Sequence, residues 1–355
     1  MEDRAQLRAA AAERAVLRGH LRRVWGVPGT ALGLVCAPAG LPDRCFRSWH
    51  YWWQAHLLDC LVDAQRRAPS RQRRSRLRSV VRGHRLRNLG PLTNAYHDDM
   101  AWYGLALLRA GEFSGVSYRP AVAVLGRVLR EEWDAAPAGG IPWRSGDTFR
   151  NAPANGPAAV LLARLGDPAR AGAISDWIEA NLLDSASGLI RDGVRDGAAE
   201  PGDRIFYTYC QGVVLGAETE LMTADRDGRH IDRACRLVRA IAAQLAPGGI
   251  LVGCTEGDGG LFAGITARYL TGAAIRLPVR TREQRAARGT AAELVRASAE
   301  AAWRHRRVVD GRPRFGFDWS APAGPAPAEL STQLSAWMLL EGAAVLARSV
   351  DSRDG

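Results

Sequence analysis

The chain has 355 residues, of which 47% are hydrophobic and 24% are charged. This composition is typical of a globular protein with a sizeable core, and it excludes a collagen-like or largely disordered chain. The net charge of +11 comes from 48 basic side chains that are all arginine. We interpret this bias as a product of GC-rich coding, so the charge alone does not indicate a nucleic-acid partner.

Helical periodicity predicts twelve helices that follow one another almost without interruption, and no convincing strand. Glycine and proline separate most of them, as at Gly90-Pro91 and Pro247-Gly248. We expect the helices over residues 3–23, 45–66, 71–87, 95–110, 117–134, 152–165, 168–182, 204–222, 228–245, 258–275, 283–306 and 330–348.

Every second helix starts with polar and aromatic residues that the other helices lack. These starts lie near residues 45, 95, 152, 204, 258 and 330. They include Trp49, His50, Trp52 and Trp53; Tyr96 to Asp99; Asn151 and Asn155; Phe206 to Tyr209 with Gln211; Thr255 to Gly260; and Ser331 to Gln333. Aromatic residues at helix starts are also common as hydrophobic staples, but staples do not explain six corresponding places.

A helix pair that repeats about every 50 residues indicates a toroid or solenoid, in which each pair buries its apolar face on its neighbours. Six such pairs predict an all-α fold that closes into an (α/α)6 barrel. The inner helices would all point one way and bring the six polar starts to one mouth. We expect a single domain over residues 1–355, with flexible ends.

The six cysteines show no CxxC pair and no histidine spacing typical of zinc sites. We expect reduced, mostly buried thiols, with neither a metal nor a cofactor. The N-terminus has no basic region that leads into an apolar run. The apolar stretch over residues 24–40 is short and is broken by Pro28 and Gly29. These features predict a cytoplasmic protein without a transmembrane segment.

Ten arginines fall between Arg66 and Arg87. A solvated helix face is one interpretation of this cluster, and a binding site for a polyanion or a membrane surface is the other. No aromatic residue that could stack on a base lies within the cluster, so we expect no nucleic-acid partner.

Two adjacent carboxylates, Asp98 and Asp99, stand at the head of an apolar helical run. A pair of carboxylates is the usual equipment for cleaving glycosidic bonds. Aspartate near a helix N-terminus is also common as a cap or as a partner of the helix dipole. Backbone N–H groups at the helix start are expected to keep Asp98 ionised, and its charge to raise the pKa of Asp99.

Five motifs combine polar, aromatic and glycine residues. They are Tyr96-His97-Asp98-Asp99-Met100-Ala101-Trp102, Gly139-Gly140-Ile141-Pro142-Trp143, Asn151 with Ala154-Asn155-Gly156-Pro157, Tyr207-Thr208-Tyr209-Cys210-Gln211-Gly212, and Asp258-Gly259-Gly260-Leu261-Phe262. Together these motifs resemble glycoside hydrolase family 76, the α-1,6-mannanase family with an (α/α)6 barrel. The resemblance covers nearly the whole chain.

The resemblance implies a retaining mechanism in which Asp98 is the nucleophile and Asp99 is the general acid and base. It also implies a carbohydrate partner, an α-mannan or mannoside. Apolar faces for the sugars would come from Trp143, Tyr207 and Phe262, and hydrogen bonds to hydroxyls from Asn151, Asn155, Gln211 and Asp258. For Trp143 and Phe262, core packing is nearly as good an interpretation.

The main prediction is therefore an endo-acting α-1,6-mannanase that requires no metal. A mannan transglycosylase, or a hydrolase of another α-mannoside, would use the same site. A barrel that binds carbohydrate without catalysis is a third possibility, and the arginine cluster leaves open a polyanion or membrane-surface binder. The oligomeric state cannot be predicted from these patterns.

Overall fold

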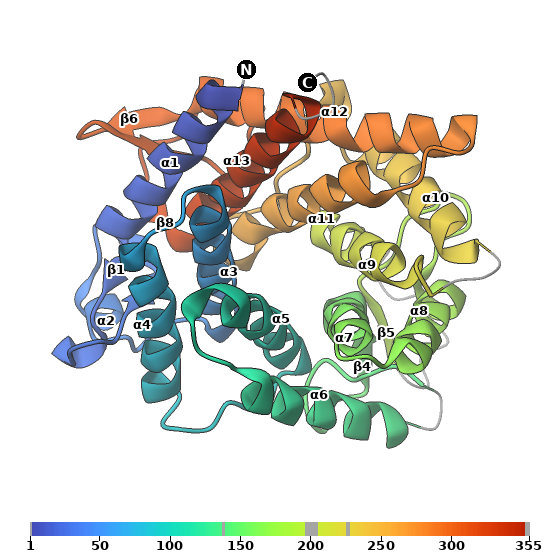
Figure 1. Cartoon of the computed structure of the whole chain (residues 1–355), viewed down its shortest axis with the longest axis horizontal. Coiled ribbons are helices and arrows are strands. Elements are labelled where there is room, and N and C mark those ends of the chain that lie inside the picture. The colour runs from blue at the N-terminus through green and yellow to red at the C-terminus, as the bar shows by residue number, and fades with distance from the viewer. Residues whose placement is uncertain (1, 137–138, 196–204, 225–227, 352–355) are drawn as a thin grey trace.

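The computed structural model describes residues 2–136, 139–195, 205–224 and 228–351. These residues form two concentric rings of helices, and both chain ends lie at the same side of the rings (Figure 1). The inner ring consists of α3 (Tyr51–Arg67), α5 (His97–Ser114), α7 (Ala152–Arg164), α9 (Thr208–Leu221), α11 (Phe262–Arg276) and α13 (Leu330–Asp351). Each inner helix packs against the next, and α13 packs against α3, which closes the ring.

The outer ring covers the inner one with amphipathic helices. It consists of α1 (Glu2–Gly19), α4 (Arg71–Arg87), α6 (Arg119–Asp134), α8 (Pro168–Leu182), α10 (Arg229–Gln244) and α12 (Arg282–His305). Helix α1 packs mainly against α13, the last inner helix, so the first and last parts of the chain complete the barrel together. The predicted (α/α)6 barrel is confirmed.

The inner helices are buried on nearly all sides, which is why their sequences are apolar all round. On α7, every residue from Ala152 to Leu162 is buried. Glycines let neighbouring helices approach closely. A Cβ atom at Gly212 of α9 would lie 2.6 Å from the Cα atom of Thr266 on α11, and one at Gly264 would lie 2.4 Å from the Cα atom of Ser335 on α13. A larger residue at either position would push the ring apart.

A buried ion pair network joins the first and last inner helices. The Arg67 guanidinium of α3 binds Glu13 of α1 at 2.7 Å and Glu341 of α13 at 2.9 Å. All three side chains are almost fully buried. Removing one partner would leave an uncompensated buried charge, so the network holds the closing contact of the ring in one arrangement.

The structure corrects some of the predicted element bounds. The helix expected over 45–66 begins at Tyr51, because Phe46 and His50 adopt positive φ angles of 54° and 46° that no helix accommodates. A four-residue helix, α2 (Leu41–Arg44), precedes it. The helix expected over 204–222 begins at Thr208, and residue 204 lies outside the described residues.

The prediction of no strands is wrong. Within the described ranges, short strands form four antiparallel two-stranded sheets. The pairs are β1 (Leu21–Arg22) with β2 (Leu32–Gly33), β3 (Cys36–Ala37) with β8 (Ala328–Glu329), β4 (Phe149–Asn151) with β5 (Gly193–Arg195), and β6 (Arg307–Val309) with β7 (Arg312–Arg314). Strands of two or three residues are too short to show an alternating pattern.

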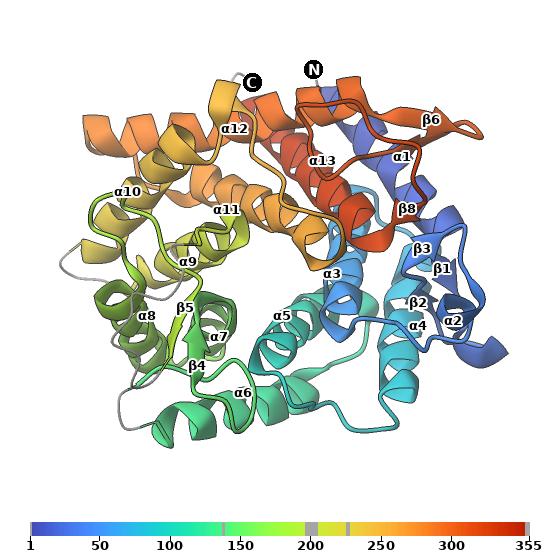
Figure 2. The same cartoon turned by 180° about the vertical axis from the view of Figure 1, so that it is seen from behind.

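The β4–β5 sheet joins the segment before α7 to the segment before α9. Figure 2 shows the barrel from this end, where the connections enter the inner helices. Three short 3-10 helices, η1 (Val24–Gly26), η2 (Pro247–Gly249) and η3 (Gly257–Leu261), also lie in connections. Most of the buried hydrophobic side chains form one continuous cluster.

The expectations about the cysteines and about a transmembrane segment can be compared with the structure. All six cysteines are free, and Cys60, Cys210 and Cys235 are buried. Among the described helices, one segment, Leu330–Ser349 of α13, is long and apolar enough to cross a membrane, but 83% of the segment is buried inside the fold.

Candidate active site

Asp98 and Asp99 lie in the first turn of α5, which begins at His97 after the cap residue Tyr96. Asp98 is partly exposed, and Asp99 keeps 8% of its accessible surface. Two acidic residues in the first turn also interact favourably with the positive end of the helix dipole. Because α5 belongs to the inner ring, its first turn lies at the mouth where the six inner helices begin.

The carboxylate of Asp98 has a hydrogen-bond donor on each oxygen. The backbone N–H of Asp99 donates to Oδ1 at 2.9 Å, and the indole N–H of Trp143 donates to Oδ2 at 3.1 Å. Donors on both oxygens hold the carboxylate in one orientation and favour its charged form. Trp143 thus lies beside Asp98 and contributes its N–H, while contact of its ring with a sugar stays a prediction.

Asp99 is held by a different set of groups. The amide nitrogen of Asn94 donates to Oδ2 of Asp99 at 2.5 Å. The amide oxygen of Asn94 accepts the backbone N–H of Tyr96 at 2.9 Å, and this second bond fixes which end of the amide faces Asp99. The backbone N–H of Trp52, in the first turn of α3, is also hydrogen-bonded to Asp99.

The two carboxyl groups titrate above their ordinary range. Burial raises the pKa of Asp98 to about 6, although its hydrogen-bond donors act in the opposite direction. Burial, followed by the charge of Asp98, raises the pKa of Asp99 well above its usual value. The effect of Asp98 on Asp99 agrees with the sequence-based expectation. Backbone N–H groups favour the ionised form of Asp98, as expected, but desolvation outweighs them, so its pKa lies above the ordinary value.

A third carboxylate, Asp258, approaches the pair from the other side of the mouth. It lies on η3 and accepts the indole N–H groups of Trp52 at 3.1 Å and Trp53 at 2.8 Å. Its charge contributes to the raised pKa values of both Asp98 and Asp99. The side chain remains 58% exposed, so its second oxygen can accept a hydrogen bond from a ligand in the mouth.

Aromatic rings from three inner helices form a wall beside these carboxylates. Tyr209 stacks on Phe262 with ring centroids 3.9 Å apart, and Tyr207 meets the same ring edge-on at 5.1 Å. Trp52 of α3 lies 6.5 Å from Tyr209. Phe262 itself is 7% exposed, so it mainly supports the tyrosines. Flat apolar faces beside carboxylates suit sugars, which present C–H surfaces and hydroxyl edges.

His97, which precedes the pair, is fully buried and holds the loop that carries Trp143. Its backbone N–H donates to the Trp143 carbonyl at 2.9 Å, and Nδ1 bonds the Pro142 carbonyl at 2.7 Å. A carbonyl only accepts, so Nδ1 carries a proton. Nε2 lies 3.4 Å from Glu132 of α6. His97 is therefore a positioning residue for Trp143.

Asn155 and Gln211 do not line the mouth, and the prediction that they contact substrate is corrected. Both are fully buried. Asn155 exchanges two hydrogen bonds with the backbone of Ile141 and donates a third to the Asn151 carbonyl. Gln211 likewise exchanges two hydrogen bonds with the backbone of Ile190 and donates a third to the carbonyl of Tyr207. No polar atom of either amide is left for a sugar.

The same arrangement recurs at two further inner helices. The side chain of Gln54 accepts the backbone N–H of Gly33 and donates to the carbonyl of the same residue. Gln333 makes the same two hydrogen bonds with the backbone of Phe315. All four side chains occupy the fourth position of their helix. We call them the four amide clamps: Gln54, Asn155, Gln211 and Gln333. They fix the connections that form the mouth.

Asn151 caps α7, since its side chain accepts the backbone N–H of Ala154 at 3.1 Å. It is 3% exposed, and its role toward substrate stays a prediction. Three residues without a predicted role also belong to the mouth: Asn94, Trp52 and Tyr209. Their signal in the sequence was their place at the polar starts of the inner helices. Within the described ranges, no three His, Cys, Asp or Glu side chains are grouped to hold a metal.

A closed double ring of helices with a carboxylate pair and an aromatic wall at its mouth defines an (α/α)6-barrel glycosidase. Comparison with known families agrees. The family model described as glycosyl hydrolase family 76 matches residues 10–351. The chain belongs to this family and is a glycoside hydrolase. No curated protein sequence matches it significantly.

Solved structures share the fold over almost the whole chain. The GH76A α-1,6-mannanase of a Salegentibacter species is 28% identical, with a TM-score of 0.85 over 96% of this chain and 99% of that one. Inactive variants of that enzyme, each with two consecutive aspartates replaced, were solved with α-1,6-mannotriose and α-1,6-mannotetrose. The Lin0763 protein of Listeria innocua is 24% identical, with a TM-score of 0.84 over 97% of this chain and 98% of that one.

Proposed function

We propose that this glycoside hydrolase cleaves α-1,6-linked mannose chains internally and with retention of anomeric configuration, using Asp98 and Asp99. The observation that carries the proposal is the consecutive aspartate pair at the start of α5. Each carboxyl group has its own hydrogen-bond donors, and the pKa values of both groups are raised. The mannanase that is 28% identical loses activity when two consecutive aspartates are replaced, which supports the same role for the pair in this chain.

Asp98 is assigned as the nucleophile. Its pKa of about 6 leaves it mostly ionised at neutral pH. In the first step one of its oxygens forms a bond to the anomeric carbon while the glycosidic bond breaks, which gives a covalent glycosyl-enzyme. The donors from Asp99 and Trp143 hold the carboxylate in place, so little reorganisation is needed as its charge moves into the new bond.

Asp99 is assigned as the general acid and base. Its pKa lies well above that of an ordinary aspartate because of burial and the charge of Asp98, so it retains a proton for the departing oxygen. Once Asp98 is bound to the sugar, its charge is gone and the pKa of Asp99 falls. Asp99, now ionised, takes a proton from water as the water oxygen attacks the anomeric carbon and releases Asp98.

The other groups in the mouth bind the sugar. Asp258 and the indole of Trp143 flank the carboxylate pair, while Tyr207 and Tyr209 offer ring faces above Phe262. Aromatic ring faces can bind a mannose unit at any position along a polymer, because they contact only its C–H surface. This tolerance supports internal cleavage of a chain over removal of single end residues.

Cleavage of α-1,6-mannan by the wild-type protein and by Asp98→Asn and Asp99→Asn tests the proposal. We expect oligosaccharides of several lengths from the wild type, and loss of at least about 1000-fold in rate for Asp98→Asn. Products longer than the substrate would instead indicate transglycosylation. Equal binding of mannan by all three proteins, without any product, would indicate a binding protein and contradict the proposal.

A further inference from the structure

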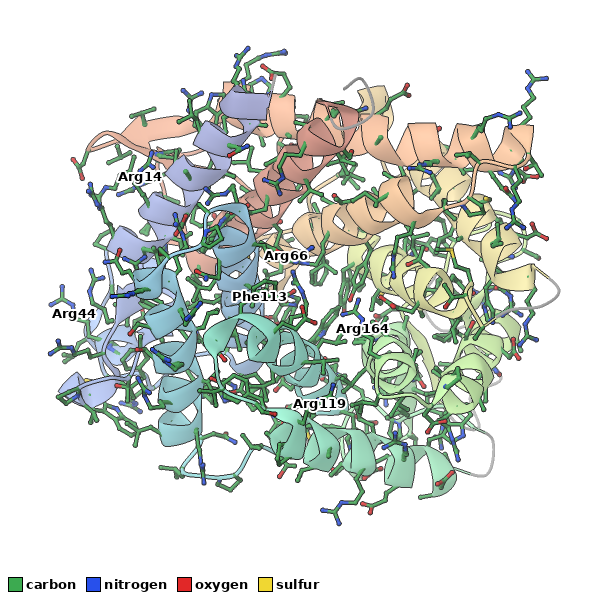
Figure 3. The ribbon with its side chains drawn as sticks, viewed as in Figure 1. Arg14, Arg44, Arg66, Phe113, Arg119 and Arg164 are labelled. Carbon is green, nitrogen blue, oxygen red and sulfur yellow. The ribbon has the colours of Figure 1, made fainter. Side chains whose placement is uncertain are left out.

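A second cavity lies at the opposite end of the barrel, where the inner helices finish. It has a volume of about 230 Å³. Figure 3 shows this end, with Arg66 at the end of α3 and Arg164 at the end of α7 beside the central space. The charged residues that line the cavity are Arg66, Arg109, Arg164, Arg268 and Arg276 together with Asp59, Asp63 and Glu341.

Two of these arginines are neutralised by two aspartates. Arg109 of α5 forms ion pairs with both Asp59 and Asp63 of α3, and Arg268 of α11 approaches the same two carboxylates at 3.3 and 2.7 Å. The arginines hold the pKa of Asp59 at about 2 despite burial. This group of four side chains therefore carries no net charge.

The remaining charges do not balance. Arg164 and Arg276 share a single carboxylate, Glu220, which does not line the cavity. Glu341 and Glu13 are balanced by Arg67 and Arg73, because Arg67 pairs with both carboxylates and Arg73 pairs with Glu13. Arg66 is exposed and has no ion pair with any residue that the structure describes. Two positive charges at the cavity are thus left without a counter-charge.

Buried nitrogen atoms at the cavity also lack partners. Nε and Nη2 of Arg268, which are both N–H donors, are buried without a hydrogen bond to any described residue. Such atoms are costly unless an acceptor satisfies them. Because the surrounding charge is positive, an anion would be a better acceptor than water.

The cavity is separate from the mouth. His56 packs between Trp52 on the mouth side and Trp102 on the cavity side, with ring centroids 5.5 and 4.8 Å away. Trp102, Tyr269 and Met338 supply apolar lining below this layer. A ligand in the cavity would not touch Asp98 or Asp99.

We propose that this cavity binds a small organic phosphate, with the phosphate group on the arginines and the organic part against the apolar lining. Guanidinium groups recognise phosphate through paired, charge-assisted hydrogen bonds. Arg66 and the Arg164 and Arg276 pair supply the unbalanced positive charge. The volume exceeds what a single phosphate needs, which leaves room for an organic group of about the size of a sugar.

Calorimetric titration of the full chain with inorganic phosphate and with mannose 6-phosphate tests the proposal. Phosphate is mostly dianionic at about pH 8, and chloride at matched ionic strength serves as the reference. Arg66→Gln is the informative variant, because Arg66 is exposed and its loss breaks no ion pair among the described residues. Arg127→Gln, an exposed arginine on α6 away from the cavity, is the matched control.

We expect one phosphate site per chain, with tighter binding of mannose 6-phosphate, and binding about tenfold weaker in Arg66→Gln but unchanged in Arg127→Gln. Cleavage of mannan has no part in this readout, so the result is independent of the proposed function. Absence of saturable binding would overturn the proposal. An equal effect of chloride, or equal weakening in both variants, would also overturn it, since either would show general screening of charge.

Discussion

The indole N–H of Trp143 donates to Oδ2 of Asp98 across 3.1 Å and joins the loop before β4 to the first turn of α5. The loop is itself tied to α5, because His97 bonds the carbonyl groups of Pro142 and Trp143. The conformation of this loop therefore helps to fix the orientation of the proposed nucleophile, and its hydrogen bond lowers the pKa of Asp98 against the larger effect of burial.

Replacing Trp143 by Phe keeps an aromatic ring but removes the donor to Asp98. The ionised form of Asp98 loses a stabilising bond, so its pKa rises above about 6, by about one unit. We expect the acid limb of the kcat/KM profile to move to higher pH by the same amount. Trp303→Phe, which removes no group in contact with Asp98 or Asp99, should leave the profile unchanged. An unmoved acid limb in the Trp143 variant would contradict the assignment.

Asp98→Asn is expected to stabilise the protein at neutral pH. The folded pKa of Asp98 is raised to about 6 from an ordinary 3.8. The stability that the protonated Asp98 carboxyl contributes is therefore fully present below the pKa that Asp98 has in the unfolded chain. It is lost as the pH rises through the folded pKa of about 6. At about pH 8 the variant should melt a few degrees above the wild type, by roughly 2–4 °C, and the difference should vanish near pH 4.

Asp167→Asn serves as the control for that experiment, because its effect on the melting temperature is expected to have the opposite sign. A hydrogen bond from Arg130 lowers the pKa of Asp167, so its stabilisation is present at neutral pH and is lost on acidification. The variant should be less stable than the wild type at about pH 8. If both variants melt above the wild type at about pH 8, or both melt below it, the electrostatic account is refuted.

The amide clamps are predicted to matter for stability and not for sugar contact. Asn155→Ala removes three hydrogen bonds and leaves both backbone groups of Ile141 buried without these partners. We expect a loss of about 2 kcal/mol or more in the free energy of unfolding, with KM unchanged at temperatures where the variant is folded. A raised KM with normal stability would restore Asn155 as a substrate contact.

The aromatic wall is predicted to contribute binding energy through Tyr209. Tyr209→Ala removes the ring that stacks on Phe262 and should raise KM for mannan about tenfold, which corresponds to about 1.4 kcal/mol. Tyr209→Phe keeps the ring and should behave like the wild type. Equal KM values for all three proteins, measured by reducing-sugar release, would place the sugar elsewhere.

The barrel and the location of its mouth could be predicted because the repeat of helix pairs brings six polar helix starts together. Asp98, Asp99 and Asp258 could be found for the same reason, since each lies at or just before the start of an inner helix. Trp143 lies in the loop before β4 and was predicted only through the family resemblance. The roles of Asn155 and Gln211 could not. Amides at helix starts have the same sequence signal whether they bind a sugar or a backbone, and only the path of the preceding connection shows that Ile141 and Ile190 lie within reach.

The titration of Asp98 was also beyond sequence reasoning. The helix start supplies donors that favour the charged form, whereas burial favours the neutral form, and the balance depends on side chains that are distant in sequence. The charge of Asp258, 160 positions after Asp98, contributes to the result. Its place beside the pair follows only from the closed ring.

The most direct test of the central claim is the anomeric configuration of the first product released from α-1,6-mannan. Proton NMR during the first minutes of reaction, before mutarotation, separates the α and β reducing ends. A covalent intermediate on Asp98 requires two inversions, so we predict the α anomer as the initial product. Initial formation of the β anomer would contradict a nucleophilic role for Asp98.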